Sequence, residues 1–239
     1  MTPAAFIPRP YLRAGHRLHR LLKEQGLYPV VAASVLCVGL FAFRAYLSRS
    51  WTYYFLLWNL FLAGVPYLAS LWVVALYHRH PGRWWLLIPP GVLSIAFFPN
   101  APYIITDFFH LVERPPVPLW YDLGLLASFA WTGVVLGVYA LRLLQNVVTQ
   151  LVGRVVGWLF TLGVLGLSGV GIYLGRFLRW NSWDLLLQPR AVLYDIAVRV
   201  RHPLGHPQTM GVTLLFSALV AFCYLALVLG PSSVDDHDR

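Results

Sequence analysis

Long apolar runs, separated by short polar segments, decide what this chain can fold into. Each run extends over roughly 20 residues, the length that an α-helix needs to cross a hydrocarbon core of about 30 Å. Only 11% of the 239 residues are charged and 59% are hydrophobic, whereas a soluble domain has about 25% charged residues. We therefore predict an all-α, polytopic transmembrane helical bundle of about six spans, with the lipid bilayer as its main partner.

The runs divide the chain into an arm, a bundle and a tail. Residues 1–27 carry basic side chains near one helical stripe with leucines beside them, which predicts an amphipathic helix on the membrane surface. Residues 28–230 form the bundle, and residues 231–239 form a polar tail. The expected spans are residues 28–47, 51–76, 84–112, 119–144, 153–174 and 209–229.

The third span is expected to be broken. Its first apolar stretch, 84–98, extends only about 22 Å as a helix and is too short to cross the bilayer. Pro99 and Asn100 then interrupt it, so residues 100–112 either complete the crossing as a second half-helix or fold back as a re-entrant one. The N-termini of such half-helices present unpaired N–H groups, which often mark binding sites.

Polar side chains recur along the second half of this broken span. Asn100, at the expected N-cap, Tyr103, Asp107 and His110 have the spacing of one helical face, and Glu113 lies one turn further. Asp107 and His110 are the candidate catalytic pair. Three interpretations remain open: Asp107 orients His110 as a general base, the group ligates a divalent metal, or Asp107 pairs with an arginine and locks the bundle. We assign no metal site, because the sequence has no HExxH motif.

A second polar cluster follows the fifth span. Together with the N-terminus at Asn100, its two arginines, Arg176 and Arg179, favour an anion site for a phosphate or carboxylate head group. The candidate ligand-binding residues of both clusters, with an aspartate at the start of the fourth span, are Asn100, Tyr103, Glu113, Asp122, Arg176, Arg179, Asn181 and Asp184.

Two apolar spans carry features of their own. The fifth span is rich in glycine and holds the small-xxx-small pairs Gly153/Gly157 and Gly171/Gly175, so we expect this helix to be central in the bundle. In the second span, Asn59 is expected to form a hydrogen bond with a neighbouring helix rather than to contact a substrate.

The charges predict an orientation in the plasma (inner) membrane. With the N-terminus in the cytoplasm, most basic residues fall in cytoplasmic segments, and Arg44 is expected to snorkel at the outer end of the first span. The net charge of +9 is then expected to anchor the protein to anionic lipid, with no nucleic acid bound. The acids between the arm and the tail all fall on the outer face, where they can pair with arginines: Asp107, Glu113, Asp122, Asp184 and Asp195.

Two of these stretches resemble the hallmark motifs of a known family. Residues Phe98–Leu111 (FPNAPYIITDFFHL) and Gly171–Asp184 (GIYLGRFLRWNSWD) are similar to the two long motifs of the uncharacterised bacterial integral-membrane domain-of-unknown-function 1361 family. Asp122, in the triplet Trp-Tyr-Asp, also fits that family's pattern. The resemblance covers roughly residues 50–230. It implies a multispanning bacterial inner-membrane protein and implies no activity.

Three classes of function remain open at this point. The first is a protein with an anion-binding site on its non-cytoplasmic face that binds or processes an envelope lipid or glycan intermediate. The second is an ion- or proton-coupled transporter, and the third is a structural or assembly protein without a ligand. The sequence identifies no cofactor, oligomeric state or reaction.

Overall fold

The computed structural model describes residues 26–201 and 207–229, so the expected amphipathic arm and polar tail lie outside the described residues. Every named element in the described part is helical, and six segments are long and apolar enough to cross a membrane, which confirms the all-α polytopic bundle. The elements are α2 (Leu27–Ser48), α3 (Tyr54–Arg79), η1 (Trp84–Leu87), α4 (Ile88–Phe97), α5 (Asn100–Tyr103), η2 (Ile104–His110), α6 (Leu119–Val152), α7 (Arg154–Phe177), α8 (Asp184–Leu187), α9 (Pro189–Arg201) and α10 (Pro207–Leu229).

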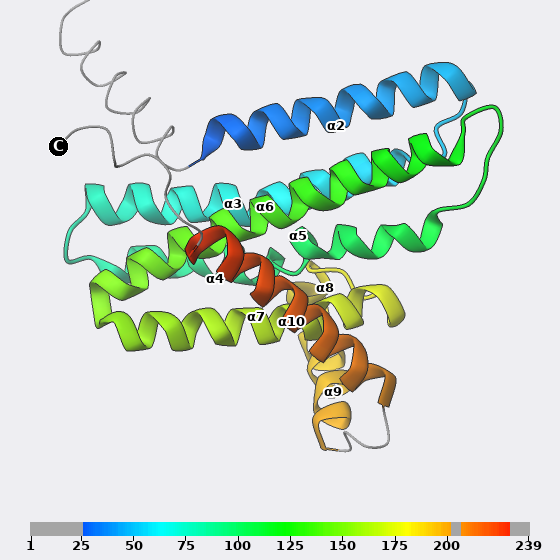
Figure 1. Ribbon diagram of the computed structural model, residues 1–239. Helices are drawn as coiled ribbons and strands as arrows, with labels where there is room; N and C mark the ends of the chain where they lie inside the picture. Colours follow the sequence, from blue (N-terminus) through cyan, green and yellow to red (C-terminus); the bar gives the residue numbers. More distant parts are fainter. Residues whose placement is uncertain (1–25, 202–206, 230–239) are drawn as a thin grey trace, which may run out of the picture.

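The helix α6 is the central element of the bundle. It contacts α2, α3, α5, η2, α7 and α10, and it lies in the middle of the ribbon (Figure 1). In the most apolar 18-residue stretch of α6, 61% of the residues are buried, against 39% in the corresponding stretch of the glycine-rich α7. The expectation that α7 is central is therefore wrong. Two of its glycines, Gly163 and Gly166, face open space where a Cβ would meet nothing.

The third span completes its crossing and does not fold back. It runs antiparallel to α3 along its whole length. At one end of the pair, the Tyr53 hydroxyl donates to the carbonyl oxygen of His110. Further along, Asn59 contacts Asp107. Beyond these, the Ser94 hydroxyl donates to the carbonyl oxygen of Pro66. The break lies between α4 and α5, at Phe98 and Pro99, as the sequence predicts.

Glycines on two helices accommodate this break. On α6, a Cβ added at Gly133 would overlap the carbonyl oxygen of Ala101. On α7, a Cβ at Gly171 would lie 2.5 Å from Cγ of Pro99, and one at Gly175 would lie 3.1 Å from the ring of Tyr103. The irregular backbone is therefore enclosed between two helix faces that lack side chains, which satisfies the rule that such backbone must be shielded from lipid.

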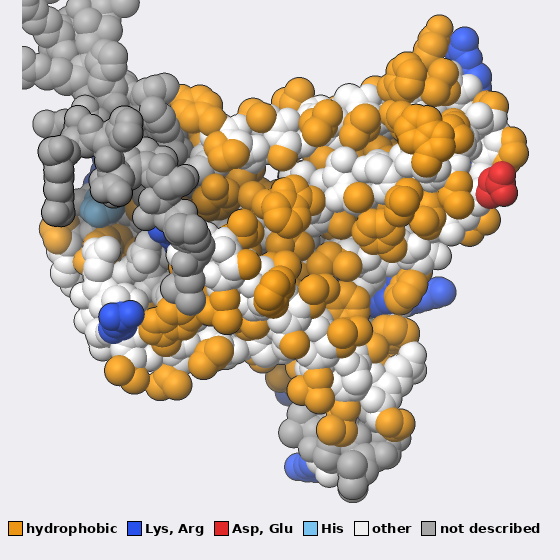
Figure 2. Space-filling view, in the orientation of Figure 1, with side chains coloured by type: hydrophobic (Ala, Val, Ile, Leu, Met, Phe, Trp, Pro, Cys, Tyr) orange, Lys and Arg blue, Asp and Glu red, His pale blue; other side chains and the backbone are white. Residues whose placement is uncertain are grey.

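Charged side chains gather at the ends of the bundle, while hydrophobic side chains cover the visible middle (Figure 2). One end of the bundle carries the connections 49–53 and 111–118 and the segment 178–201, and we call it the site end. The opposite end carries basic residues such as Arg79, Arg83 and Arg154. All acids of the described ranges lie at the site end, on or beside its connections: Asp107, Glu113, Asp122, Asp184 and Asp195.

Candidate functional site

A cavity of about 380 Å³ lies near the site end, between α3, the α4–α5 break, α7 and the segment from residue 180 through α9. Its apolar wall comes mainly from α7, α8 and α9, through Leu167, Val170, Leu185, Leu193 and Ile196. Aromatic rings and uncharged polar groups also line the cavity. The residues of this second set are Trp58, Asn59, Asn100, Tyr103, Trp180, Asn181 and Ser182.

Three asparagines of the lining are held by the protein through their amide nitrogens. Nδ2 of Asn59 donates to Oδ2 of Asp107 at 2.7 Å. Nδ2 of Asn100 donates to the carbonyl oxygen of Phe97 at 2.9 Å and to Oγ of Ser182 at 2.8 Å. Asn181 donates to Oδ2 of Asp184, through its backbone N–H at 2.7 Å and through Nδ2 at 3.4 Å. The amides of Asn59 and Asn100 are therefore fixed in one orientation, and that of Asn181 is held mainly through its backbone N–H.

Asp107 lies directly behind the cavity. Its side chain is 2% exposed, Nη1 of Arg176 is 3.8 Å from its Oδ1, and Asn59 separates it from the cavity. Of the three interpretations of Asp107, the ion pair with an arginine is the one whose geometry is present. In this arrangement the carboxylate positions Asn59 and compensates the charge of Arg176.

His110 contacts Arg176 and forms no hydrogen bond with Asp107. Nη1 of Arg176 lies 3.2 Å from Nε2 of His110, and because a guanidinium can only donate, the imidazole accepts and is neutral here. The imidazole also packs on Phe55, with ring centroids 4.9 Å apart. Within the described ranges, no three side chains of the types His, Cys, Asp and Glu gather as metal ligands would.

The expected polar stripe is divided between two surroundings. Asn100 and Tyr103 line the cavity, while Asp107 and His110 contact α3 and Arg176. The reason is that the helix tightens after Tyr103 into η2, which has 3.0 residues per turn instead of 3.6. At that pitch, positions i, i+3, i+7 and i+10 no longer share one face. The hydroxyl of Thr106, which donates to the carbonyl oxygen of Tyr103 at 2.7 Å, accompanies this change.

Asn100 is not the N-cap that the sequence predicts. It is the first residue of α5, and its side chain donates hydrogen bonds instead of accepting one from the helix. The N–H groups of Ala101 and Tyr103 donate to the carbonyl oxygens of Phe98 and Pro99. The tight turn at the break thus satisfies these donors within the chain, and they are not available to an anion.

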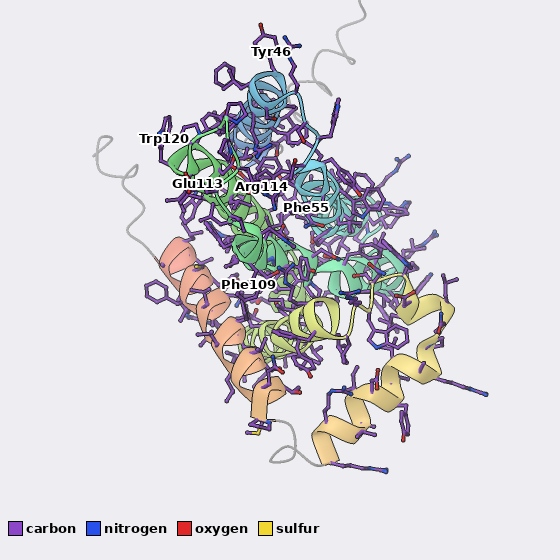
Figure 3. All side chains as sticks on the ribbon, turned by 90° about the vertical axis from the view of Figure 1, so that its right-hand side faces the viewer. Tyr46, Phe55, Phe109, Glu113, Arg114 and Trp120 are labelled. Atoms are coloured by element: carbon purple, nitrogen blue, oxygen red, sulfur yellow. The ribbon has the colours of Figure 1, made fainter. Side chains whose placement is uncertain are left out.

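A second buried cluster lies apart from the cavity and joins α2 to α6. Nε and Nη2 of Arg44 donate to Oδ1 and Oδ2 of Asp122 at 2.7 and 3.1 Å, and the two side chains are 2% and 0% exposed. The expectation that Arg44 snorkels is therefore wrong, because Asp122 gives it a partner inside the bundle. The ring of Tyr53 lies 4.4 Å from the guanidinium of Arg44 and 5.1 Å from that of Arg114, and burial raises the pKa of its hydroxyl. Figure 3 views this end, with Arg114 among α2, α3 and α6.

The remaining candidates lie at the surface or support the lining. Glu113 is exposed and forms no ion pair within the described ranges. Arg179 is also exposed and has a left-handed backbone, with φ of 61°. Asp184 holds Asn181. From the sequence, Asn59 was predicted to form a hydrogen bond with a neighbouring helix, and its bond to Asp107 confirms this. Its place in the cavity lining was not predicted.

The helix α9 is attached to the bundle by polar contacts beside the cavity. Nε1 of Trp180 donates to Oδ2 of Asp195 at 2.8 Å. Arg199 forms an ion pair with Asp195 at 3.2 Å within α9 itself, and its guanidinium reaches the bundle, 5.8 Å from the ring centroid of Tyr173 on α7. These contacts place the apolar side of α9 against the cavity.

Comparisons with known proteins agree with the sequence motifs. Searches of curated proteins and of solved structures found no significant match. A family model described as "Protein of unknown function (DUF1361)" matches residues 58–223, a range that includes the whole third span and the polar lining of the cavity. Because this match covers well over half of the chain, the protein belongs to the DUF1361 family.

Proposed function

We propose that this protein binds an amphipathic molecule, of the kind of an envelope lipid or glycan intermediate, in the cavity near the site end. The observation that carries the proposal is the cavity itself. Its volume of about 380 Å³ falls in the range of about 300–1,000 Å³ typical of ligand pockets. It combines an apolar wall with a small group of fixed polar side chains, which is the pattern of a site that orients an amphipathic ligand.

An anionic group of such a ligand is proposed to lie at the rim, beside Arg179. This arginine is exposed and directly precedes Trp180, which lines the cavity. Arg176 is less suited to the task, because its guanidinium already faces Asp107 and His110. In the proposed arrangement, the polar head enters the cavity and any phosphate remains near water, where its charge costs less free energy.

A proton-coupled transporter is the second candidate. The observation in its favour is the buried carboxylate of Asp107 within a membrane-spanning segment, connected through Arg176 to the exposed His110. A binding protein predicts ligand retention without a proton gradient. A transporter predicts uptake that such a gradient drives.

Filling the cavity should release the ligand. Ala96 lines the cavity, and the variant Ala96→Phe places a ring there. We expect the molar amount of co-purified amphiphile to fall at least about tenfold, which corresponds to about 1.4 kcal/mol of binding free energy. The measurement is mass spectrometry of lipids extracted from protein purified in native nanodiscs.

The matched control is Ala127→Phe, because Ala127 is exposed on α6 and does not line the cavity. Its lipid content should equal that of the wild type. Thermal unfolding of both variants checks that they are folded. Equal lipid content in the wild type and in folded Ala96→Phe would count against the proposal.

The site end is proposed to face away from the cytoplasm, in an inner membrane. Support comes from the pairing of charges: several arginines at the site end face acids, as Arg44, Arg176 and Arg199 do, whereas the arginines at the opposite end have no acid beside them in the described ranges, as in a cytoplasmic loop with an excess of Lys and Arg. Cysteine substitutions at Glu113, which is exposed, and at His80, which is half-buried, test this, because the two residues lie in loops at opposite ends. In intact cells, an impermeant maleimide should label Glu113→Cys and not His80→Cys. Labelling of the unsubstituted protein gives the background to subtract. The reverse labelling pattern would invert the proposed orientation.

A further inference from the structure

We propose that the part of the ligand inside the cavity is a neutral, polyhydroxylated head group, such as a sugar ring, that donates hydrogen bonds to the side-chain oxygens of Asn59, Asn100 and Asn181. This inference rests on the proposed function, because it names the chemical class that the same cavity binds. It follows from which polar atoms of the lining the protein already uses.

The protein engages an amide donor of each of the three asparagines: both side-chain N–H groups of Asn100, and one each of Asn59 and Asn181. Asn59 faces a carboxylate and Asn100 faces a backbone carbonyl, and both of these groups only accept hydrogen bonds. The assignment of nitrogen and oxygen in these two amides is therefore determined by their partners. Asn181 likewise donates to the carboxylate of Asp184. Each Oδ1 is left as an acceptor without a hydrogen bond in the described ranges.

Two hydroxyls complete the polar lining. Oγ of Ser182 accepts a hydrogen bond from Asn100, so its own hydrogen can be donated. The hydroxyl of Tyr103 forms no hydrogen bond with the described residues and can donate or accept. Nε1 of Trp180 is already engaged with Asp195. The lining therefore offers three acceptor oxygens, two hydroxyls and the second N–H of Asn59 and of Asn181, a mixed set that hydroxyl groups can match because they both donate and accept.

The absence of charge in the described lining disfavours the two competing classes of head group. The lining contains no Lys, Arg, Asp or Glu. An anion inside the cavity would face three acceptor oxygens and no positive charge, and a cation would lack a carboxylate to compensate it. Either charge would lose its hydration without a partner, at a cost of several kcal/mol.

Aromatic rings supply the other half of a sugar site. Trp58, Tyr103 and Trp180 line the cavity beside the asparagines. Such rings are large apolar surfaces with one polar edge, and they can pack against the C–H face of a sugar ring while its hydroxyls reach the amides. The apolar wall at Leu193 and Ile196 then contacts the alkyl part of the ligand.

Three probes with the same tail test the head group. The purified full chain, held in amphipol, is titrated with octyl-β-D-glucoside, octyl phosphate or octyltrimethylammonium below their micelle concentrations, and tryptophan fluorescence follows binding. We expect the glucoside to bind at least about tenfold more tightly than either charged probe, a difference of about 1.4 kcal/mol.

Two variants connect this preference to the lining. Asn181→Ala and Tyr103→Phe should each weaken glucoside binding about 3- to 10-fold, the effect of one lost hydrogen bond, and leave octyl phosphate binding unchanged. The matched controls are Asn146→Ala and Tyr54→Phe, since both residues are exposed and lie outside the cavity. They should leave glucoside binding as in the wild type.

The outcomes separate this inference from the proposed function. Tighter binding of the phosphate or the ammonium probe would overturn the polyol inference while leaving an amphiphile site in place. If no probe binds although Ala96→Phe still releases a native lipid, the polyol inference also fails while the amphiphile site remains. If no probe binds and Ala96→Phe changes nothing, both proposals fail.

Discussion

Replacing Asp122 with alanine is expected to destabilise the bundle by about 3–5 kcal/mol, the cost of removing one partner from a buried ion pair. Its two oxygens accept from Nε and Nη2 of Arg44, and neither side chain is more than 2% exposed. Without the carboxylate, a guanidinium remains in the packed interior between α2 and α6. Because the guanidinium is buried, little water reaches it to compensate for the loss.

The experiment is equilibrium unfolding in mixed micelles. Arg49→Ala is the matched control, because Arg49 is exposed near the same end of α2 and, among the described residues, forms no ion pair and stacks on Tyr46. It should change stability by less than about 0.5 kcal/mol. The double variant Arg44→Met with Asp122→Leu should recover most of the loss, since apolar pairs often replace buried ion pairs without cost. A double variant as unstable as Asp122→Ala would show that the charges themselves do not account for the effect.

The second large effect is expected from a single methyl group. Gly133→Ala should destabilise the bundle by about 1–3 kcal/mol, because its Cβ would overlap the carbonyl oxygen of Ala101 and the backbone must shift to make room. The carbonyl belongs to α5, at the break of the third span, so the strain falls where the chain is least regular.

Gly124→Ala, on the same helix, is the control for this substitution. A Cβ at Gly124 would meet nothing within 4 Å, and alanine in place of a helical glycine favours the helix by about 1 kcal/mol. The two variants should therefore shift the unfolding midpoint in opposite directions under identical conditions. Equal shifts would mean that the close approach of α5 to α6 does not limit stability.

The fold could be predicted from the sequence because apolar length and the need to satisfy backbone polar groups are local constraints. The break at Pro99 followed from the same reasoning, since the preceding run is too short to cross. The position of each helix in the bundle did not follow. Glycines permit close approach but do not select the partner. Gly171 packs on Pro99, whereas Gly163 and Gly166 on the same helix face open space.

The site could be predicted only in part, because side-chain partners depend on pitch and on contacts between distant segments. The sequence placed Asp107 and Arg176 at the same end, and the structure brings them within 3.8 Å. It did not predict the tightening at η2, which separates Asp107 from Asn100. The pairing of Arg44 with Asp122 could not be predicted either. An arginine near the end of a span is expected to lie at the membrane interface unless its partner on another helix is known.

The attachment of α9 has a kinetic consequence. One wall of the cavity is a 13-residue helix, attached by the indole hydrogen bond from Trp180 to Asp195 and by the contact of Arg199 with the ring of Tyr173. Breaking these contacts requires far less free energy than separating α6 from its neighbours, so α9 can open while the bundle remains folded. The residence time of a bound molecule would then follow the strength of the Trp180–Asp195 bond and would be independent of the ion pair at Arg44.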